Sequence, residues 1–168
     1  MNKKLMIGYC LLSSFAIPSL HAQSHFRFPE NKTIYHKGWI DLNKNGKEDI
    51  YENPNEPIEA RVKDLLSKMN IDEKTCQLAT LYGYGRVLKD SLPTAKWKDE
   101  IWKDGIANID EEFNGFQDWR DSQKTPLATN IAHHIWGMNE VQRFFIEQTR
   151  LGIPADFTNE GIRGVEAS

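Results

Sequence analysis

The feature that most constrains this sequence is a long amphipathic segment followed by a short apolar run. From about Thr129 to Leu151 the apolar side chains recur with the period of a helix that buries one face. These side chains are Ile131, Ile135, Met138, Val141, Phe144 and Phe145. Gly152 stands where a left-handed helix terminator is expected, and Ile153 to Phe157 has the length of a buried strand. A helix followed by a strand predicts an α/β protein.

Two further helices are predicted near the start of this α/β region. Asn55 to Met69 should form a helix, with Pro57 in its first turn. Asn70 and Glu73 have the spacing of a capping box, which predicts a second helix through about Gln77. The first helix carries a stripe that we expect to be buried, formed by Ile58, Val62, Leu65, Leu66 and Met69.

Strands are expected over Leu78 to Tyr84 and Gly105 to Ile109, separated by a short helix that Thr94 caps and that carries Trp97 and Ile101 on one face. Residues 110–125 form a polar loop. A second polar loop follows the strand at 153–157, and such loops hold the substrate contacts of α/β barrel enzymes. Because a barrel of this kind needs about 250 residues, we expect this chain to be the front part of one.

The first 22 residues have the order of a secretory signal peptide. Lys3 and Lys4 precede an apolar run from Leu5 to Leu20, and the small residue Ala22 marks the expected cleavage site. The run is short for a membrane-spanning helix. The sequence therefore predicts an exported protein, periplasmic or extracellular, without membrane insertion after cleavage.

Charge and cysteine content narrow the function further. The formal net charge is -3, and the expected cleavage removes two lysines, so the mature chain is mildly acidic. Without a stripe of Lys and Arg, nucleic acid is excluded as a partner. Cys76 is the one cysteine left after cleavage and is predicted to fill core space. His133 and His134 lie about 100° apart on their helix, so one imidazole is expected to be partly buried and the other solvated, and the two should not share a metal.

A calcium-type loop is predicted at residues 41–52, within an N-terminal extension at 23–54. Oxygen-bearing groups stand at the spacing of a calcium loop, with Gly46 at the reversal. The predicted ligands are Asp41, Asn43, Asn45, Lys47 through its carbonyl, Asp49 and Glu52. A structural calcium ion is one interpretation, and a solvated turn that needs no metal is the other. No cofactor is expected for chemistry.

Two stretches carry a resemblance to a known family. The first is Asn55 to Leu78, with the junction Met69-Asn-Ile-Asp-Glu73-Lys74; the second is Gln142 to Glu166, with Arg150-Leu-Gly-Ile-Pro before a carboxylate loop. Their order resembles glycoside hydrolase family 3. The resemblance implies that residues 55–168 begin the family's N-terminal domain, a (β/α)8 TIM-type barrel that is incomplete in this chain.

The same resemblance implies a substrate and a site. Most members are retaining, exo-acting β-glycosidases, here expected to act on β-linked glucoside or xyloside oligosaccharides. Glu160 matches the family's carboxylate that grips the terminal sugar, with Arg163 and Asn159 as weaker neighbours. A carboxylate can accept hydrogen bonds from two adjacent hydroxyls. The simpler interpretation of Glu160 is a solvated loop acid.

The family's nucleophile and acid/base have no counterpart in these 168 residues, so no catalytic residue is predicted and the chain alone is expected to be inactive. Two alternatives stay open. The first is a secreted binding or structural module clipped by calcium, without catalysis. The second is a non-functional fragment that does not fold without further strands.

Overall fold

The computed structural model describes residues 27–83, 90–99, 102–113 and 131–159. Three α-helices and five short strands are described in these ranges, together with two short 3-10 helices, η1 and η2. In chain order the elements are η1 Lys32–Ile34, β1 Tyr35–His36, β2 Trp39–Ile40, α1 Ile58–Lys68, α2 Ile71–Cys76, β3 Thr80–Tyr82, η2 Ala95–Lys98, β4 Asn108–Asp110, α4 Ile131–Gln148 and β5 Asp156–Thr158. No helix in these ranges is long and apolar enough to span a membrane.

Local sequence signals set the helix ends. The predicted capping box at α2 is confirmed: Asn70 Oδ1 accepts from Glu73 N at 2.8 Å, and the Glu73 carboxylate accepts from Asn70 N at 2.9 Å. Gly152 has φ +58, the left-handed conformation expected after the long helix. The close approach of Leu42 O, 2.6 Å from where a β-carbon would stand, also requires glycine at this position.

The main sheet is parallel, in the order β3, β4, β5. Its register pairs Leu81 with Ile109 and Ile109 with Phe157, so one row of apolar side chains crosses the sheet. β1 and β2 form a separate antiparallel pair that turns at Gly38, where φ is +95. The three strands predicted over 78–84, 105–109 and 153–157 are present but shorter, and β4 and β5 each begin three residues later and end one residue later than predicted.

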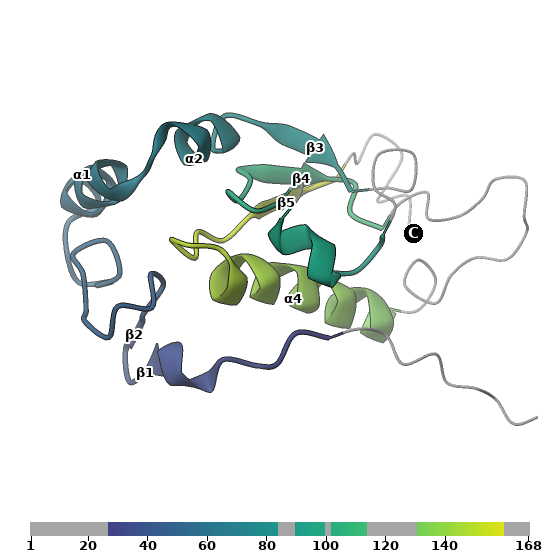
Figure 1. Cartoon of the computed structure of the whole chain (residues 1–168), viewed down its shortest axis with the longest axis horizontal. Helices are drawn as coiled ribbons and strands as arrows, with labels where there is room; N and C mark the ends of the chain where they lie inside the picture. The colour runs from purple at the N-terminus through teal and green to yellow at the C-terminus, as the bar shows by residue number, and fades with distance from the viewer. Residues whose placement is uncertain (1–26, 84–89, 100–101, 114–130, 160–168) are drawn as a thin grey trace, which may run out of the picture.

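The core lies between the sheet and α4 (Figure 1). Trp102 is fully buried, and its ring meets Phe145 edge-on at a centroid distance of 5.6 Å. On the other side of α4 runs the N-terminal arm, defined here as residues 27–40, which contributes Phe28 to the same cluster (Figure 1). The buried cluster comprises Phe28, Trp97, Trp102, Ile106, Ile109, Phe113, Val141, Phe144, Phe145 and Ala155.

The predicted barrel fold is wrong for the described residues. They form an open three-stranded parallel sheet and a small antiparallel pair, and neither closes on itself. A (β/α)8 barrel closes because eight tilted strands each hydrogen-bond to two neighbours. In the described sheet β3 and β5 each have one strand neighbour, so the α/β alternation is present and the closure is not.

The buried face predicted for α1 is also wrong in part. Ile58, Val62 and Leu66 are 67%, 51% and 48% exposed, whereas Met69 just beyond the helix is buried. The side of α1 that does make contacts is polar: Arg61 Nε donates to Tyr51 O at 3.1 Å, and Asp64 accepts from Tyr51 N at 3.1 Å. The period predicts a helix correctly, but no described element covers its apolar face.

Candidate functional site

The candidate functional site is the carboxyl edge, defined here as the ends of β3, β4 and β5 with the residues that follow each. Ligands of open parallel α/β sheets bind outside the carboxyl ends of the strands. The register sets Tyr82 beside Asp110 and Asp110 beside Thr158 at this edge. Gly83, the run 111–112 and Asn159 follow directly.

Side chains and backbone join the ends of β4 and β5. The Thr158 hydroxyl donates to Asp110 Oδ1 at 2.7 Å, and Glu111 N donates to Thr158 O at 2.9 Å. Asp110 is half-buried and Thr158 is exposed. A carboxylate that accepts and a hydroxyl that both donates and accepts can exchange hydrogen bonds with the hydroxyls of a polyol.

Glu112 is the unusual group of this edge. It is 3% exposed, and neither carboxyl oxygen has a hydrogen-bond partner among the described residues. Burial raises the pKa of Glu112 to about 8, because an ionised carboxylate is poorly solvated inside the protein. At neutral pH the group is therefore mostly protonated and can donate one hydrogen bond.

The residues predicted to contact substrate divide between described and undescribed segments. Asn159 is exposed directly after β5, on the carboxyl edge. Glu160 and Arg163 lie outside the described residues. Of the three predicted contacts, the structure thus places one, and it places this residue on the same edge as Asp110 and Thr158.

The 41–52 loop is held by hydrogen bonds within itself. Asn43 Nδ2 and Asn45 Nδ2 approach Asp49 Oδ2 at 2.6 and 2.7 Å, so three predicted ligands converge. Asp41 accepts from the backbone amides of residues 45 and 46 at 3.0 and 2.8 Å. Glu52 accepts from the amides of residues 43 and 49 at 3.1 and 2.9 Å. The two terminal carboxylates therefore close the loop through its backbone.

Charge around Asp49 follows from the same contacts. Burial is the largest single influence and acts to raise its pKa, but hydrogen bonds from Asn43, Lys68 and Asn45 together lower the pKa of Asp49. Lys68 Nζ lies 3.0 Å from Asp49 Oδ1. Lys47, predicted to contribute only its carbonyl, is exposed. Among the described residues no group of three or more His, Cys, Asp or Glu side chains is placed to hold a metal.

Lys44 fixes the 41–52 loop onto the end of α4. Its ammonium donates to Ile146 O and Thr149 O, both at 2.7 Å, and to Leu42 O at 2.5 Å. The last carbonyls of a helix lack intrahelical partners and carry partial negative charge. A lysine at this end therefore donates hydrogen bonds to these carbonyls and places a positive charge near them. Tyr51 adds a hydrogen bond from its hydroxyl to Leu151 O at 3.3 Å.

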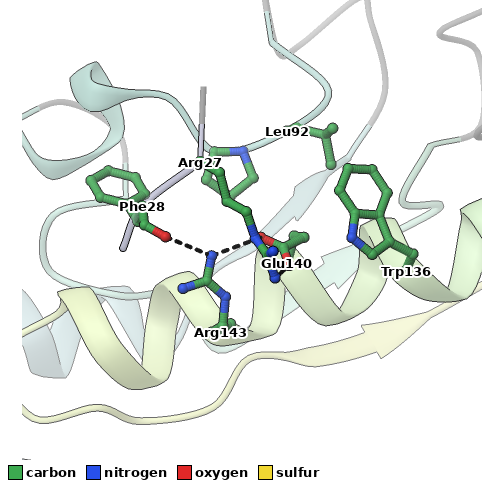
Figure 2. Close-up of a pocket in the computed structure, with 7 residues that line it drawn as sticks. Arg27, Phe28, Leu92, Trp136, Glu140 and Arg143 are labelled. Atoms are coloured by element: carbon green, nitrogen blue, oxygen red, sulfur yellow. Dashed lines mark hydrogen bonds and ion pairs between the residues drawn. The ribbon is translucent and has the colours of Figure 1, made fainter. Parts of the chain in front are cut away.

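A small pocket of about 60 Å³ lies between α4, the N-terminal arm and the segment that holds Leu92. Figure 2 shows Glu140 at its base, bound by two arginines. Arg27 Nε and Arg143 Nη2 donate to Glu140 Oε2 at 3.0 and 2.7 Å. Arg143 Nη2 also donates to Phe28 O at 3.1 Å. Because the charged groups pair with one another, the residues of this pocket are best explained as a structural contact that holds the N-terminal arm against α4.

The remaining predicted candidates have ordinary environments. His133 is exposed and His134 is half-buried with its ring edge-on to Phe113, which confirms the prediction of one solvated and one partly buried imidazole. Cys76 is half-buried, and burial raises the pKa of its thiol, which disfavours a nucleophile.

Sequence reasoning missed the carboxyl-edge residues of β4. The sequence pattern predicts a polar loop at Asp110 and Glu112 and no role for either, although Asp110 directly follows a predicted strand and Glu112 stands two residues later. Their distance from the strand end was the available signal, since parallel strands bring their carboxyl ends to one edge. Which of them is buried depends on packing against Gly83 and was not readable from the sequence.

No family model matches the sequence. The chain is similar to a protein of Formosa agariphila named "Putative beta-xylosidase". The two are 31% identical over 121 residues, which make up 70% of this chain and 14% of that protein. The matched region thus spans about one seventh of the length of this relative.

Proposed function

We propose that this chain supplies part of the sugar-binding site for the hydrolysis of β-linked xylosides, as a portion of a glycoside hydrolase family 3 protein. The observation that carries the proposal is the 31% identity over 121 residues to a protein named as a β-xylosidase. The two motif stretches that resemble the family, 55–78 and 142–166, are consistent with this proposal. We further propose the retaining, exo-acting mode of the family and export through the segment 1–22.

The carboxyl edge is the proposed place of sugar recognition. Asp110 has one carboxylate oxygen held by Thr158 and presents an acidic group beside an exposed hydroxyl. Asn159 follows on the neighbouring strand, and Glu160 is proposed to grip two adjacent hydroxyls of the terminal sugar. Charge-assisted hydrogen bonds to hydroxyls are stronger than neutral ones, which favours a polyol as ligand.

The test is a titration of the full chain with xylobiose or cellobiose, in which NMR spectra report the change in backbone amide chemical shifts. We expect shifts at Asp110 and Thr158, with tighter binding of xylobiose. Glu160→Gln and Asp110→Asn should each weaken binding about tenfold or more, because each removes a charged acceptor. Glu30→Gln, at an exposed carboxylate of the N-terminal arm, is the matched control and should change nothing.

Release of nitrophenol from an aryl β-xyloside, measured beside an aryl β-glucoside, is the second arm of this test. Because no nucleophile or acid/base is predicted in these 168 residues, we expect xylobiose binding without hydrolysis of the aryl xyloside. Hydrolysis would contradict the expected inactivity, and a chain that does not bind xylobiose contradicts the proposed role in sugar recognition.

A second candidate function is a structural module stabilised by calcium at the 41–52 loop. The favouring observation is that the side chains of Asn43 and Asn45 both reach Asp49 in a loop that Lys44 attaches to α4. Both amides donate through Nδ2, so calcium binding requires each amide to turn its Oδ1 toward the ion. Calcium at about 100 times its dissociation constant would then stabilise the fold by about 3 kcal/mol. Asp41→Asn should abolish the rise in unfolding temperature with calcium, and Glu48→Gln, at an exposed position of the loop, should preserve it. An unchanged unfolding temperature would identify a metal-free turn.

A further inference from the structure

Glu112 differs from the other buried glutamates of the described chain. Glu73 accepts from Arg150 Nε at 2.8 Å, and Glu147 accepts from Tyr35 Oη at 3.0 Å. Glu140 is bound by two arginines, and Glu52 by backbone amides. Glu112 is as buried as these residues, yet neither of its oxygens has a hydrogen-bond partner in the part of the chain that the structure describes. A buried polar group without a partner needs an explanation, because burial removes water without replacing it.

Gly83 creates the space that Glu112 occupies. A β-carbon at residue 83 would collide with Glu112 Oε2 and stand 2.8 Å from Glu112 Cα. Two backbone hydrogen bonds hold the surrounding turn: Gly83 N donates to Asp110 O at 2.8 Å, and Phe113 N donates to Gly83 O at 2.9 Å. The position of Glu112 is thus fixed by one glycine and by two bonds that a local movement can break.

The backbone on both sides of Glu112 is strained. Glu111 has φ +53 and Phe113 has φ +67, a left-handed conformation that side chains other than glycine rarely adopt. Strained residues of this kind gather at switch regions, where the surrounding structure holds them in place. The 111–113 turn therefore stores strain next to an unpaired acid.

Among the described residues, the titratable groups on the elements around the 111–113 turn come from β3, β4 with its turn, and α4. Tyr82 lies at the end of β3, and Asp110 and Glu111 belong to β4 and its turn. His134 comes from α4 and meets the Phe113 ring edge-on at 5.4 Å. None of these groups donates a hydrogen bond to Glu112. Burial alone raises the pKa of Glu112 to about 8, so its charge changes near the upper end of the physiological range.

We propose that Glu112 is a pH-sensitive conformational switch of the carboxyl edge: while neutral it stays buried against Gly83, and once ionised it leaves this position and the 111–113 turn opens. The ionised carboxylate gains water only by leaving its buried position. Movement of the turn also breaks the hydrogen bond from Phe113 N to Gly83 O and relieves the positive φ values of Glu111 and Phe113. The edge then presents a carboxylate of Glu112 in addition to that of Asp110. This inference does not depend on the proposed function.

The first measurement is a pH titration of the full chain, labelled with carbon-13 at the glutamate carboxyl groups and monitored by NMR. One carboxyl resonance should titrate with a midpoint near 8 and should be missing from Glu112→Gln. Glu111→Gln, which removes the neighbouring acid, is the matched control and should keep the resonance. If the resonance of Glu112 titrates near the ordinary value of glutamate, the proposal is overturned.

The second measurement concerns the opening itself and uses hydrogen exchange of single amides. Between pH 7 and 9 the exchange rate of the Phe113 amide should rise about tenfold relative to that of Asn108, whose amide bonds to Ala79 O within the sheet. Glu111→Gln should show the same rise. If Glu112 titrates near pH 8 while the ratio of the two exchange rates stays constant, the carboxyl ionises in place and the switch is refuted.

Discussion

Two glutamates, Glu140 on α4 and Glu112 just after β4, are both buried, and their pKa values shift in opposite directions. At Glu140, burial is the largest influence and acts to raise the pKa, yet hydrogen bonds from Arg27 and Arg143 lower it overall. At Glu112 the described residues offer no such bonds, and burial raises the pKa to about 8. Where the N-terminal arm meets α4, the charge of Glu140 is thus balanced by two arginines. At the carboxyl edge, Glu112 has no such cation among the described residues and stays mostly neutral at pH 7.

The difference shows that burial sets the sign of a pKa shift only where partners are missing. A paired buried charge stabilises one arrangement, because removal of either partner leaves the other desolvated. An unpaired buried acid makes its surroundings depend on pH. The first arrangement suits a joint, and the second suits a site that changes state.

The largest effect is expected from Arg143→Met. This change removes one of the two arginines that bind Glu140, and so makes the environment of Glu140 more like that of Glu112. The change leaves Glu140 with Arg27 alone and removes the bond from Arg143 Nη1 to Glu147 at 3.1 Å. We expect a loss of about 3 to 5 kcal/mol in the free energy of unfolding, measured in urea at pH 7. Arg27→Met is the matched control, and since Arg27 is 59% exposed it should cost at most about 1 kcal/mol. Equal losses for the two arginines would contradict the comparison.

Glu112→Gln tests the sign of the pH dependence that the buried acid of the carboxyl edge gives to the free energy of unfolding. The folded pKa of Glu112 lies above its unfolded value, so the stability that the neutral acid contributes is complete below about pH 4.5 and is lost as the pH rises to about 8. Relative to the variant, wild type should lose about 1.4 kcal/mol per pH unit over this window, or about 3 kcal/mol at pH 7.

Glu140→Gln should give the opposite sign in the same urea series. The folded pKa of Glu140 is lowered, so its contribution is present above the unfolded pKa and is lost as the pH falls. Parallel pH profiles for the two glutamine variants would show that the two acids share one environment, against the structure.

Lys44→Met sharpens the comparison at the end of α4 that meets the 41–52 loop. Three backbone carbonyls lose their common cationic donor. We expect a loss of about 2 kcal/mol, because hydrogen bonds to charged groups contribute more than neutral ones. Thermal unfolding checks the value, and Lys47→Met, at an exposed position of the same loop, should leave the unfolding temperature unchanged.

The smallest effect is expected from Leu66→Ser on α1, which belongs to neither glutamate region. Leu66 is 48% exposed, so its replacement should change the free energy of unfolding by less than about 0.5 kcal/mol. Phe145→Ala, in the fully buried core, should cost about 3 to 5 kcal/mol in the same urea experiment. A large loss for Leu66→Ser would mean that the face of α1 is covered in solution.

Local signals predicted more of the fold than of the site. The capping box at Asn70 and the terminator at Gly152 involve atoms within a few residues, so the sequence specifies them directly. The apolar stripe of α1 specified a helix but not what would cover it, because burial depends on distant segments. The predicted barrel failed for the same reason, since closure of a sheet is decided by strand partners far along the chain.

By itself, the sequence determined the α/β order, the ends of α2 and of the long helix, and the tight turns of the 41–52 loop, because each depends on neighbouring residues. Only the tertiary structure decided that Lys44 would reach the carbonyls of a helix 102 residues away, and that Glu140 would meet Arg27 across 113 residues. The tertiary structure also left Glu112 buried with no hydrogen-bond partner among the residues it describes. Charge compensation is a property of packing in three dimensions, and the order of residues along the chain does not state which groups will meet.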